Sequence, residues 1–271
     1  MRRRGNLILG GALVALIVAA GLLAPVIAGS AAFAQNLGNA MLPPSAAHWL
    51  GTDQYGRDLF ARIVYGARIS LFEVALGVGM AMAAGIPAGL VAGWFGALTD
   101  EVIGWSTNIL FAFPGIILAI LIVSVLGPGL FNLLLAIAIF SVPVYVRLTR
   151  NLTLALKQID YVEAARSTGA STARVLFQHV LRNALPPLLV QATLTAGTVI
   201  LAAASLSFLG LGAQPPLPEW GAMMSSARDL LGVDNDLSLF PGLAITVAVL
   251  GFNLLGDGVR DLLDPHRGVR G

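Results

Sequence analysis

The stretch YVEAARSTGAST, residues 161–172, lies at the centre of a basic interruption in an otherwise strongly apolar chain. This interruption extends over residues 151–183. Within it, Ile159, Val162 and Ala165 recur at intervals of three, which is the spacing of one apolar stripe along a helix. We therefore predict a short helix here, with one apolar side and one polar side.

A turn and a second helix are expected to follow. Gly169 can adopt the left-handed conformation that ends many helices, and Ser171 is placed to cap the next helix. Pro186 and Pro187 then stand at the start of an apolar run, where proline is tolerated. Periodicity alone leaves two interpretations open: a helix pair that docks on a soluble partner, or one that only packs against a membrane surface.

The composition of the whole chain is typical of a membrane protein. Of the 271 residues, 57% are hydrophobic and 11% charged, and the mean hydropathy is +0.84. Soluble domains carry about 25% charged residues, so this chain could not cover a water-facing surface of its own size. The net charge of +2 gives no reason to expect a nucleic-acid partner. The absence of cysteine excludes disulfides, thiolate metal sites and cysteine nucleophiles.

We predict an all-α, polytopic fold with six transmembrane helices, because crossing a bilayer takes about 20 apolar residues whose backbone groups pair within the segment. The fourth and sixth spans are short, so their ends should extend into flanking residues. The predicted spans are Leu7–Ile27, Ile69–Gly93, Val102–Leu126, Leu130–Val146, Leu185–Leu209 and Phe240–Leu255.

Lysine and arginine positions predict the orientation. With the N-terminus in the cytoplasm, twelve of the sixteen basic residues fall inside, as the positive-inside rule requires. Both termini are then cytoplasmic. The divisions are an N-terminal helix (1–28), an external loop (29–67), a core of five helices with the cytoplasmic loop at about 151–183 (68–265), and a tail (266–271).

The N-terminus also resembles a secretory signal, because Ala32-Phe33-Ala34 could mark a cleavage site before Gln35. The preceding apolar run is longer than the ~7–15 residues of a signal core, so we expect a retained helix.

Three other functional classes were weighed. A nucleotide-binding P-loop needs a lysine after a glycine, but the only lysine, Lys157, follows Leu156. A membrane enzyme would depend on His48, His179 and His266, of which the first two fall on opposite sides of the membrane. We therefore expect no catalytic residue, metal or cofactor in this chain.

A secondary transporter is the third class, and it would place ionisable groups deep in the membrane. Glu73 is the only acidic residue well inside a predicted span, near its outer end. A carboxylate at the interface or in a helix contact is the simpler reading of Glu73. Four amides within spans are interpreted as interhelical hydrogen bonds or polar lining of a pathway: Asn108, Asn132, Gln191 and Asn253.

A resemblance of the basic loop to a known family favours a further class, a permease subunit. Glu163-Ala164-Ala165, Gly169, His179-Val180-Leu181 and Asn183-Ala184-Leu185-Pro186 resemble the EAA loop of permeases in binding-protein-dependent ABC importers. From about His48 to Pro265 the chain is similar to the C-type permeases of the dipeptide, oligopeptide and nickel importers. The ordered blocks that carry this likeness are Leu50–Asp53 with Gly56–Asp58, Tyr65–Arg68, Phe113-Pro114, Tyr145–Arg147, Ser207–Gly212, Gln214–Pro216, Phe240–Gly242, Phe252–Leu254, Gly256–Asp261 and Asp264-Pro265.

The resemblance implies a division of labour. Such a permease, of the type I ABC importer fold, pairs with a second homologous permease to form the pore in the bacterial inner membrane. Two ABC ATPase subunits bind ATP and Mg, and an extracytoplasmic solute-binding protein delivers cargo. Contacts with membrane lipid are expected, and none with nucleic acid. The ATPase-coupling residues implied are Tyr161, Glu163, Ala164, Ala165, Gly169 and His179.

Several points stay open. Peptides are the expected cargo, with nickel, glutathione or a haem-type ligand as alternatives. Arg182 stands where the family usually has proline, which concerns how the second loop helix ends. Pro114 and Pro143 are either gating kinks or tolerated ones. The segment around Arg57–Asp58 could form a short amphipathic helix on the outer leaflet or contact the delivery protein.

Overall fold

The computed structural model describes residues 2–263, and every regular element found there is helical. The all-α prediction is therefore confirmed. The helices are α1 (Arg2–Ile27), α2 (Leu59–Phe95), α3 (Ala97–Ala112), α4 (Gly115–Leu126), α5 (Leu130–Leu156), α6 (Asp160–Ser167), α7 (Thr172–Arg174), α8 (Arg182–Phe208), α9 (Trp220–Ser226) and α10 (Asp236–Leu263). Short 3₁₀ turns occupy Leu37–Asn39 and Arg228–Leu230, and a π-helical segment occupies Val175–Leu181.

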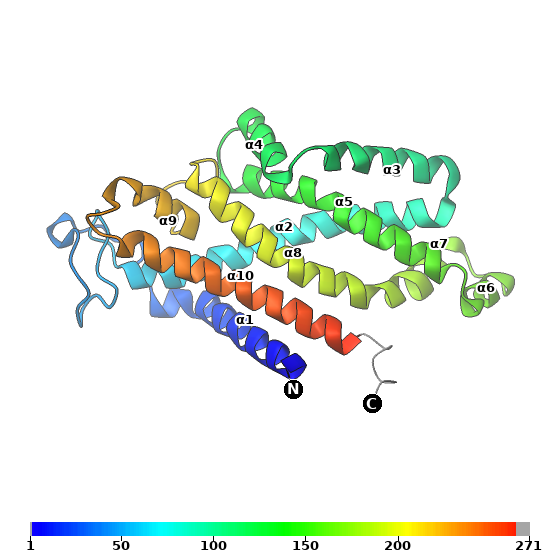
Figure 1. The fold of residues 1–271 in the computed structure, drawn as a ribbon, viewed down its shortest axis with the longest axis horizontal. Helices are drawn as coiled ribbons and strands as arrows, with labels where there is room; N and C mark the ends of the chain where they lie inside the picture. Colours follow the sequence, from blue (N-terminus) through cyan, green and yellow to red (C-terminus); the bar gives the residue numbers. More distant parts are fainter. Residues whose placement is uncertain (1, 264–271) are drawn as a thin grey trace.

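Five long helices, α1, α2, α5, α8 and α10, run side by side along the molecule (Figure 1). Each contains an apolar window long enough to cross a membrane, and the pair α3–α4 together makes a sixth candidate span. The predicted short spans do extend, since α5 reaches Leu156 and α10 begins at Asp236. At 1.5 Å per residue, the 37 residues of α2 measure about 55 Å, so this helix projects beyond a bilayer.

The third predicted span differs from the prediction, because it is not one straight helix. Helix α3 ends at Ala112, α4 begins at Gly115, and their axes differ by 91°. Proline disfavours the helical conformation in the residue before it. Phe113 is accordingly extended (φ −97°, ψ 136°), and so is Pro114 (φ −57°, ψ 126°). Pro143 acts differently, because it lies buried within an α5 that continues past it.

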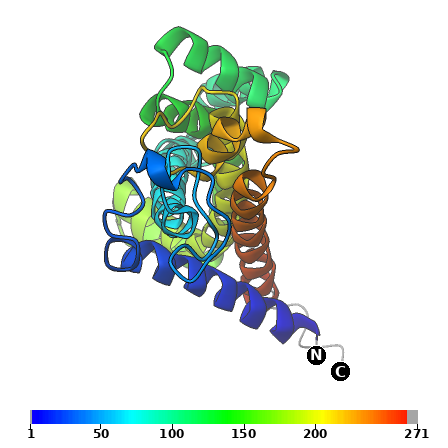
Figure 2. The same ribbon diagram turned by 90° about the vertical axis from the view of Figure 1, so that its left-hand side faces the viewer.

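Small residues allow the central helices to approach closely, as membrane helices commonly do. Gly85, Gly89 and Gly93 lie one turn apart on α2, and each faces the backbone or β-carbons of α5. Helix α1 packs on α10 in the same way, because a β-carbon at Gly10 would lie within 3 Å of Leu254 and Leu255. Figure 2 shows α1 crossing one side of the bundle, with α3 and α4 on the opposite side.

The loop between α1 and α2 covers one end of the bundle, together with α9 (Figure 2). Asp58 caps α2, accepting a hydrogen bond from the Ala61 amide (2.7 Å), and its other oxygen lies 2.8 Å from His48 Nδ1. Helix α2 therefore begins at Leu59, ten residues before the predicted span. Of the two alternatives for the segment around Arg57–Asp58, a separate amphipathic helix is not formed, since Phe60 and Ile63 belong to the first turns of α2. Contact with the delivery protein stays a prediction.

The tail 266–271, the block Asp264-Pro265 and His266 lie outside the described residues. Retention of the N-terminal helix, without cleavage before Gln35, stays a prediction. The packing of α1 against α10 and α2 supports a retained helix.

Candidate functional site

Helix α6 lies at the end of the molecule opposite the α1–α2 loop, beyond the ends of the long helices (Figure 1). Asp160 and Glu163 occupy its first turn and Arg166 its last turn. Acidic residues near a helix N-terminus and basic residues near its C-terminus interact favourably with the helix dipole and so stabilise the helix. The predicted short helix is therefore present, with charges that favour its formation.

Gly169 ends α6 in the way the sequence predicts. Its φ is +84°, in the left-handed region that favours glycine. The Gly169 amide donates to the Arg166 carbonyl (3.0 Å), and the Ala170 amide donates to the Ala165 carbonyl (3.1 Å). This pair of hydrogen bonds is the Schellman motif. The predicted cap is present as well, since the Arg174 amide donates to Ser171 Oγ (3.4 Å).

One buried side chain anchors α6 to the rest of the protein. Val162 is fully buried and packs with Leu90 and Trp94 near the end of α2, and with Val175, Leu176 and Val180 after the turn. The Trp94 carbonyl also accepts a hydrogen bond from Lys157 Nζ. Two residues of the predicted stripe, Val162 and Ala165, thus attach α6 to the cluster that contains the end of α2. The third, Ile159, differs from the prediction, because it precedes α6 and is 41% exposed.

Two predicted coupling residues, one on each side of the turn at Gly169, lie close together. Tyr161 on α6 and His179 in the π-helical segment have ring centroids 6.2 Å apart. Asn183 joins them, because its Nδ2 donates to the Tyr161 hydroxyl (3.1 Å) and to the His179 carbonyl (2.6 Å). This bridge connects α6 with the start of α8.

The second loop helix continues into the membrane span without a break. Residues Thr172–Phe208 form one helical run, and Arg182 has helical dihedral angles (φ −57°, ψ −38°). The open question at Arg182 was how the second loop helix ends, and the helix does not end there. Arginine keeps the backbone N–H that proline would remove, so nothing at this position interrupts the helix. The only departure from α-helical geometry in this run is the π-helical segment Val175–Leu181. Such segments are frequent near functional sites.

The outer surface of α6 is largely exposed. Glu163 and Ala164 are exposed, and Tyr161 is 40% exposed. The Glu163 side chain makes no hydrogen bond or ion pair with any residue between 2 and 263. A short helix held by one buried face, with small and acidic residues on its free face, suits insertion into a groove of another protein.

The four amides do not gather into one site, and each has its own surroundings. Asn108 accepts a hydrogen bond from Arg147 (2.8 Å). Asn132 donates to the carbonyls of Leu126 and Gly127 and so caps the end of α4.

Gln191 Nε2 lies 3.3 Å from Thr195 Oγ1 on the same helix. Asn253 on α10 packs against Gly197 on α8, where an added β-carbon would lie 3.2 Å from its Oδ1. Asn132 and Asn253 thus act in helix capping and helix packing. A role of any of the four in lining a pathway stays a prediction.

Glu73 is buried inside the protein. It is 1% exposed, and neither carboxylate oxygen has a hydrogen-bond partner among the described residues. Its nearest acidic neighbour is Glu219, which caps α9 by accepting hydrogen bonds from the amides of Gly221 (2.8 Å) and Ala222 (2.7 Å). Burial raises the pKa of Glu219, while the two N–H donors and Ser207 act against this rise. Glu73 is therefore part of a contact between α2 and the loop before α9.

Sequence reasoning missed the residues that attach the loop to the bundle. Trp94 and Leu90 lie about 70 positions before α6, so periodicity within the loop gave no signal for them. Asp100 and Arg150 form a bidentate ion pair that ties the start of α3 to the end of α5. Both charges flank apolar runs at the same end of the bundle, which was the one available hint.

Comparison with known proteins identifies the family. Residues 85–269 match the family described as "binding-protein-dependent transport system inner membrane component". A dipeptide transport system permease protein of Alkalihalophilus pseudofirmus is 46% identical over 258 residues, covering 95% of this chain and 85% of the relative. A glutathione transport system permease protein of Pectobacterium atrosepticum is 50% identical over 222 residues, covering 82% and 74%. The corresponding protein of Escherichia coli O157:H7 is 48% identical over 230 residues, covering 85% and 75%.

The match begins within α2 and includes α3 to α10, the turn at Gly169 and the predicted coupling residues on either side of it. With six candidate spans and relatives of this kind, the chain belongs to the family of multi-pass inner membrane permeases of binding-protein-dependent ABC transport systems.

Proposed function

We propose that this chain forms half of the pore of an ATP-driven peptide importer. A second homologous permease forms the other half, two ATPase subunits bind ATP and Mg, and an extracytoplasmic solute-binding protein delivers the cargo. The chain itself catalyses no reaction. Both termini face the cytoplasm, which puts α6 on the side of the ATPases and the α1–α2 loop on the side of the delivery protein.

The attachment of α6 is the observation that carries this proposal. Its exposed face offers Tyr161, Glu163 and Ala164 to a partner, and its buried face is bound through Val162 to α2. A force on α6 therefore reaches a helix of the pore through packed side chains. Closure of the ATPase pair would pull on α6 and move α2 and α8 with it.

Peptides are the proposed cargo because the relatives are named for a dipeptide and for glutathione, itself a tripeptide. Nickel and haem-type ligands remain to be tested. Mass spectrometry of the ligand that co-purifies with the solute-binding protein identifies the cargo directly.

Reconstitution of the whole complex in proteoliposomes tests the coupling role. Uptake of labelled dialanine should require ATP, and the double variant Glu163→Ala, Gly169→Pro should lose most uptake and most stimulation of the ATPase. Proline cannot adopt the φ of +84° found at Gly169. Glu101→Ala, at another exposed acidic residue, is the matched control. Uptake without ATP, or full transport by the double variant, would refute the proposal.

A further inference from the structure

A pocket opens at the outer end of the molecule, between the α1–α2 loop, the α8–α9 loop and α9. Its volume is about 360 Å³, within the range of pockets that hold small ligands. Two arginines line it, Arg57 before α2 and Arg62 in its first turns, and no Asp or Glu is among the lining residues. Both arginines are only 5% exposed, so this is not an ordinary basic surface.

The two guanidinium groups share one carboxylate. Arg57 Nε donates to Asp53 Oδ2 (2.7 Å), and Arg62 Nε lies 3.5 Å from the same oxygen. Asp53 Oδ1 is occupied by the amides of Tyr55 (2.9 Å) and Arg57 (3.0 Å). One positive charge of this buried group is therefore not balanced by Asp53, and burying an unbalanced charge is costly.

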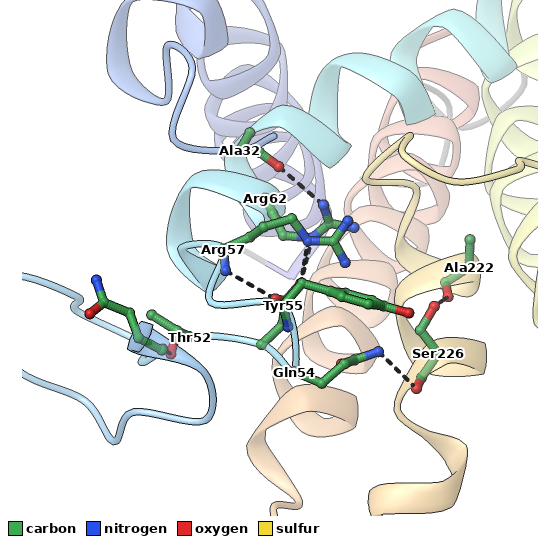
Figure 3. Close-up of polar contacts among 10 residues, drawn as sticks. Ala32, Thr52, Gln54, Tyr55, Arg57, Arg62, Ala222 and Ser226 are labelled. Carbon is green, nitrogen blue, oxygen red and sulfur yellow. Dashed lines mark hydrogen bonds and ion pairs between the residues drawn. The ribbon is translucent and has the colours of Figure 1, made fainter. Parts of the chain in front are cut away.

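The arginines are held rigidly and still have free donors. Arg62 donates through one terminal nitrogen to the Ala32 carbonyl (3.0 Å), and the Arg57 guanidinium lies over the Tyr55 ring, 4.6 Å from its centroid. Within residues 2–263, no hydrogen bond uses the terminal nitrogens of Arg57. Figure 3 shows the two guanidinium groups side by side, with Ala222 and Ser226 of α9 across from them.

The walls of the pocket are fixed by contacts between distant segments. Gln54 Nε2 donates to the Ser226 carbonyl (3.3 Å), which ties the loop to α9. Gly56 approaches the Asn36 carbonyl so closely that a β-carbon there would lie 1.8 Å from its oxygen, and its φ is +69°. The pocket is thus built into the fold.

We propose that this pocket binds the carboxylate end of a small peptide on the outer side of the membrane. A planar guanidinium with free N–H groups matches a carboxylate in two parallel hydrogen bonds. Gln35, Gln214, Ser225 and Ser226 line the rest of the pocket and can bond to peptide groups. The carboxylate also supplies the negative charge that Asp53 cannot. This inference rests on the proposed peptide cargo.

Labelling of an introduced thiol tests the proposal without requiring transport. The chain contains no cysteine, so Ser226→Cys places a single thiol at the pocket, and Ser30→Cys places one on the same end outside it. Maleimide labelling of this chain is followed by mass spectrometry in the assembled complex. For a dissociation constant of about 1 mM, 10 mM dialanine should slow labelling at the pocket about tenfold. Labelling at the Ser30→Cys control should not change.

Ligand chemistry identifies the group that is recognised. N-acetyl-dialanine, which keeps the carboxylate, should protect as well as dialanine, whereas dialanine amide should not protect. Equal protection by the amide or by inorganic phosphate would overturn the proposal. Protection that appears only with ligand-free solute-binding protein would also overturn it, because the pocket would then receive an acidic side chain of that protein.

Arginine variants complete the test. Arg57→Gln should abolish protection and Arg57→Lys should weaken it, since lysine keeps the charge but not the planar fork. Arg228→Gln, at an exposed arginine outside the pocket, should leave the protection by dialanine unchanged. If the Arg57 variants fail to assemble, the comparison of dialanine with its amide decides alone. Peptide uptake with no carboxylate protection would refute this site and leave the proposed function intact.

Discussion

The close contact between α2 and α5 yields the sharpest stability prediction, at Gly89. A β-carbon at this position would lie 2.6 Å from both the Thr149 β-carbon and the Val146 carbonyl oxygen. Unstrained contacts between such atoms are about 3.5–4.0 Å, so Gly89→Ala would require α5 to withdraw by about 1 Å. The atoms in the way belong to backbone and β-carbons, which cannot rotate aside. Gly85 and Gly93 hold the same helix on either side and resist the shift.

Overpacking of this kind typically costs about 1–3 kcal/mol. Gly79→Ala is the matched control, because Gly79 also lies in α2 but has no atom within 4 Å of the added carbon. Both variants gain the same helix propensity of about 1 kcal/mol, so the control should be neutral or stabilised. We therefore expect Gly89→Ala to unfold at a clearly lower temperature than Gly79→Ala when both are measured in the same detergent.

The functional consequence follows from the position of α5, whose end leads directly into α6. Gly89→Ala should reduce ATPase stimulation in the assembled complex, and Gly79→Ala should not. Equal melting temperatures of the two variants would show that α2 and α5 are not in tight contact, and the reasoning would be refuted.

Two further predictions concern the opposite ends of the molecule. Val162→Ala removes a fully buried side chain and should cost about 1–2 kcal/mol. It should also lower ATPase stimulation, whereas Val26→Ala, at an exposed valine on α1, should not. Equal stimulation by Val162→Ala and the parent chain would mean that Val162 does not transmit force. Because burial raises the pKa of Glu219, protonation is favoured in the folded state, so its contribution to stability is complete below the unfolded pKa and is lost as pH rises through the folded pKa. The melting temperature should therefore fall more steeply with rising pH in the parent chain than in Glu219→Gln, and identical slopes would contradict the assignment.

In the loop of residues 151–183, patterns among neighbouring residues predict the local structure but not the tertiary contacts. The spacing of Ile159, Val162 and Ala165 predicts a helix, and the φ of +84° at Gly169 and the cap at Ser171 agree with their predicted roles. These features depend on interactions between neighbours in the sequence, so a short window contains the information. The partners of Val162 on α2 were not predictable, because no local rule connects residue 162 with residues 90 and 94.

In the third predicted span, by contrast, the local sequence does not predict the shape of the backbone. Apolar length predicts one crossing from Val102 to Leu126, and length alone does not distinguish a straight helix from a broken one. Pro114 marks a possible kink, yet Pro143 has the same chemistry and leaves α5 unbroken. The difference arises because Phe113 and Pro114 are both extended in the fold, which a residue type cannot specify.

The class of protein, the number of apolar runs, the side of the membrane expected for each loop and the family likeness are all predictable from the sequence alone. These follow from composition, charge and spacing, which are properties of the chain before it folds. The tertiary structure alone decided the 91° bend between α3 and α4, the anchoring of α6 on α2, the burial of Glu73 and the pairing of Arg57 with Arg62 around Asp53. Each of these depends on segments that are distant in sequence, or on backbone geometry that packing imposes, and only folding brings their atoms within reach of one another.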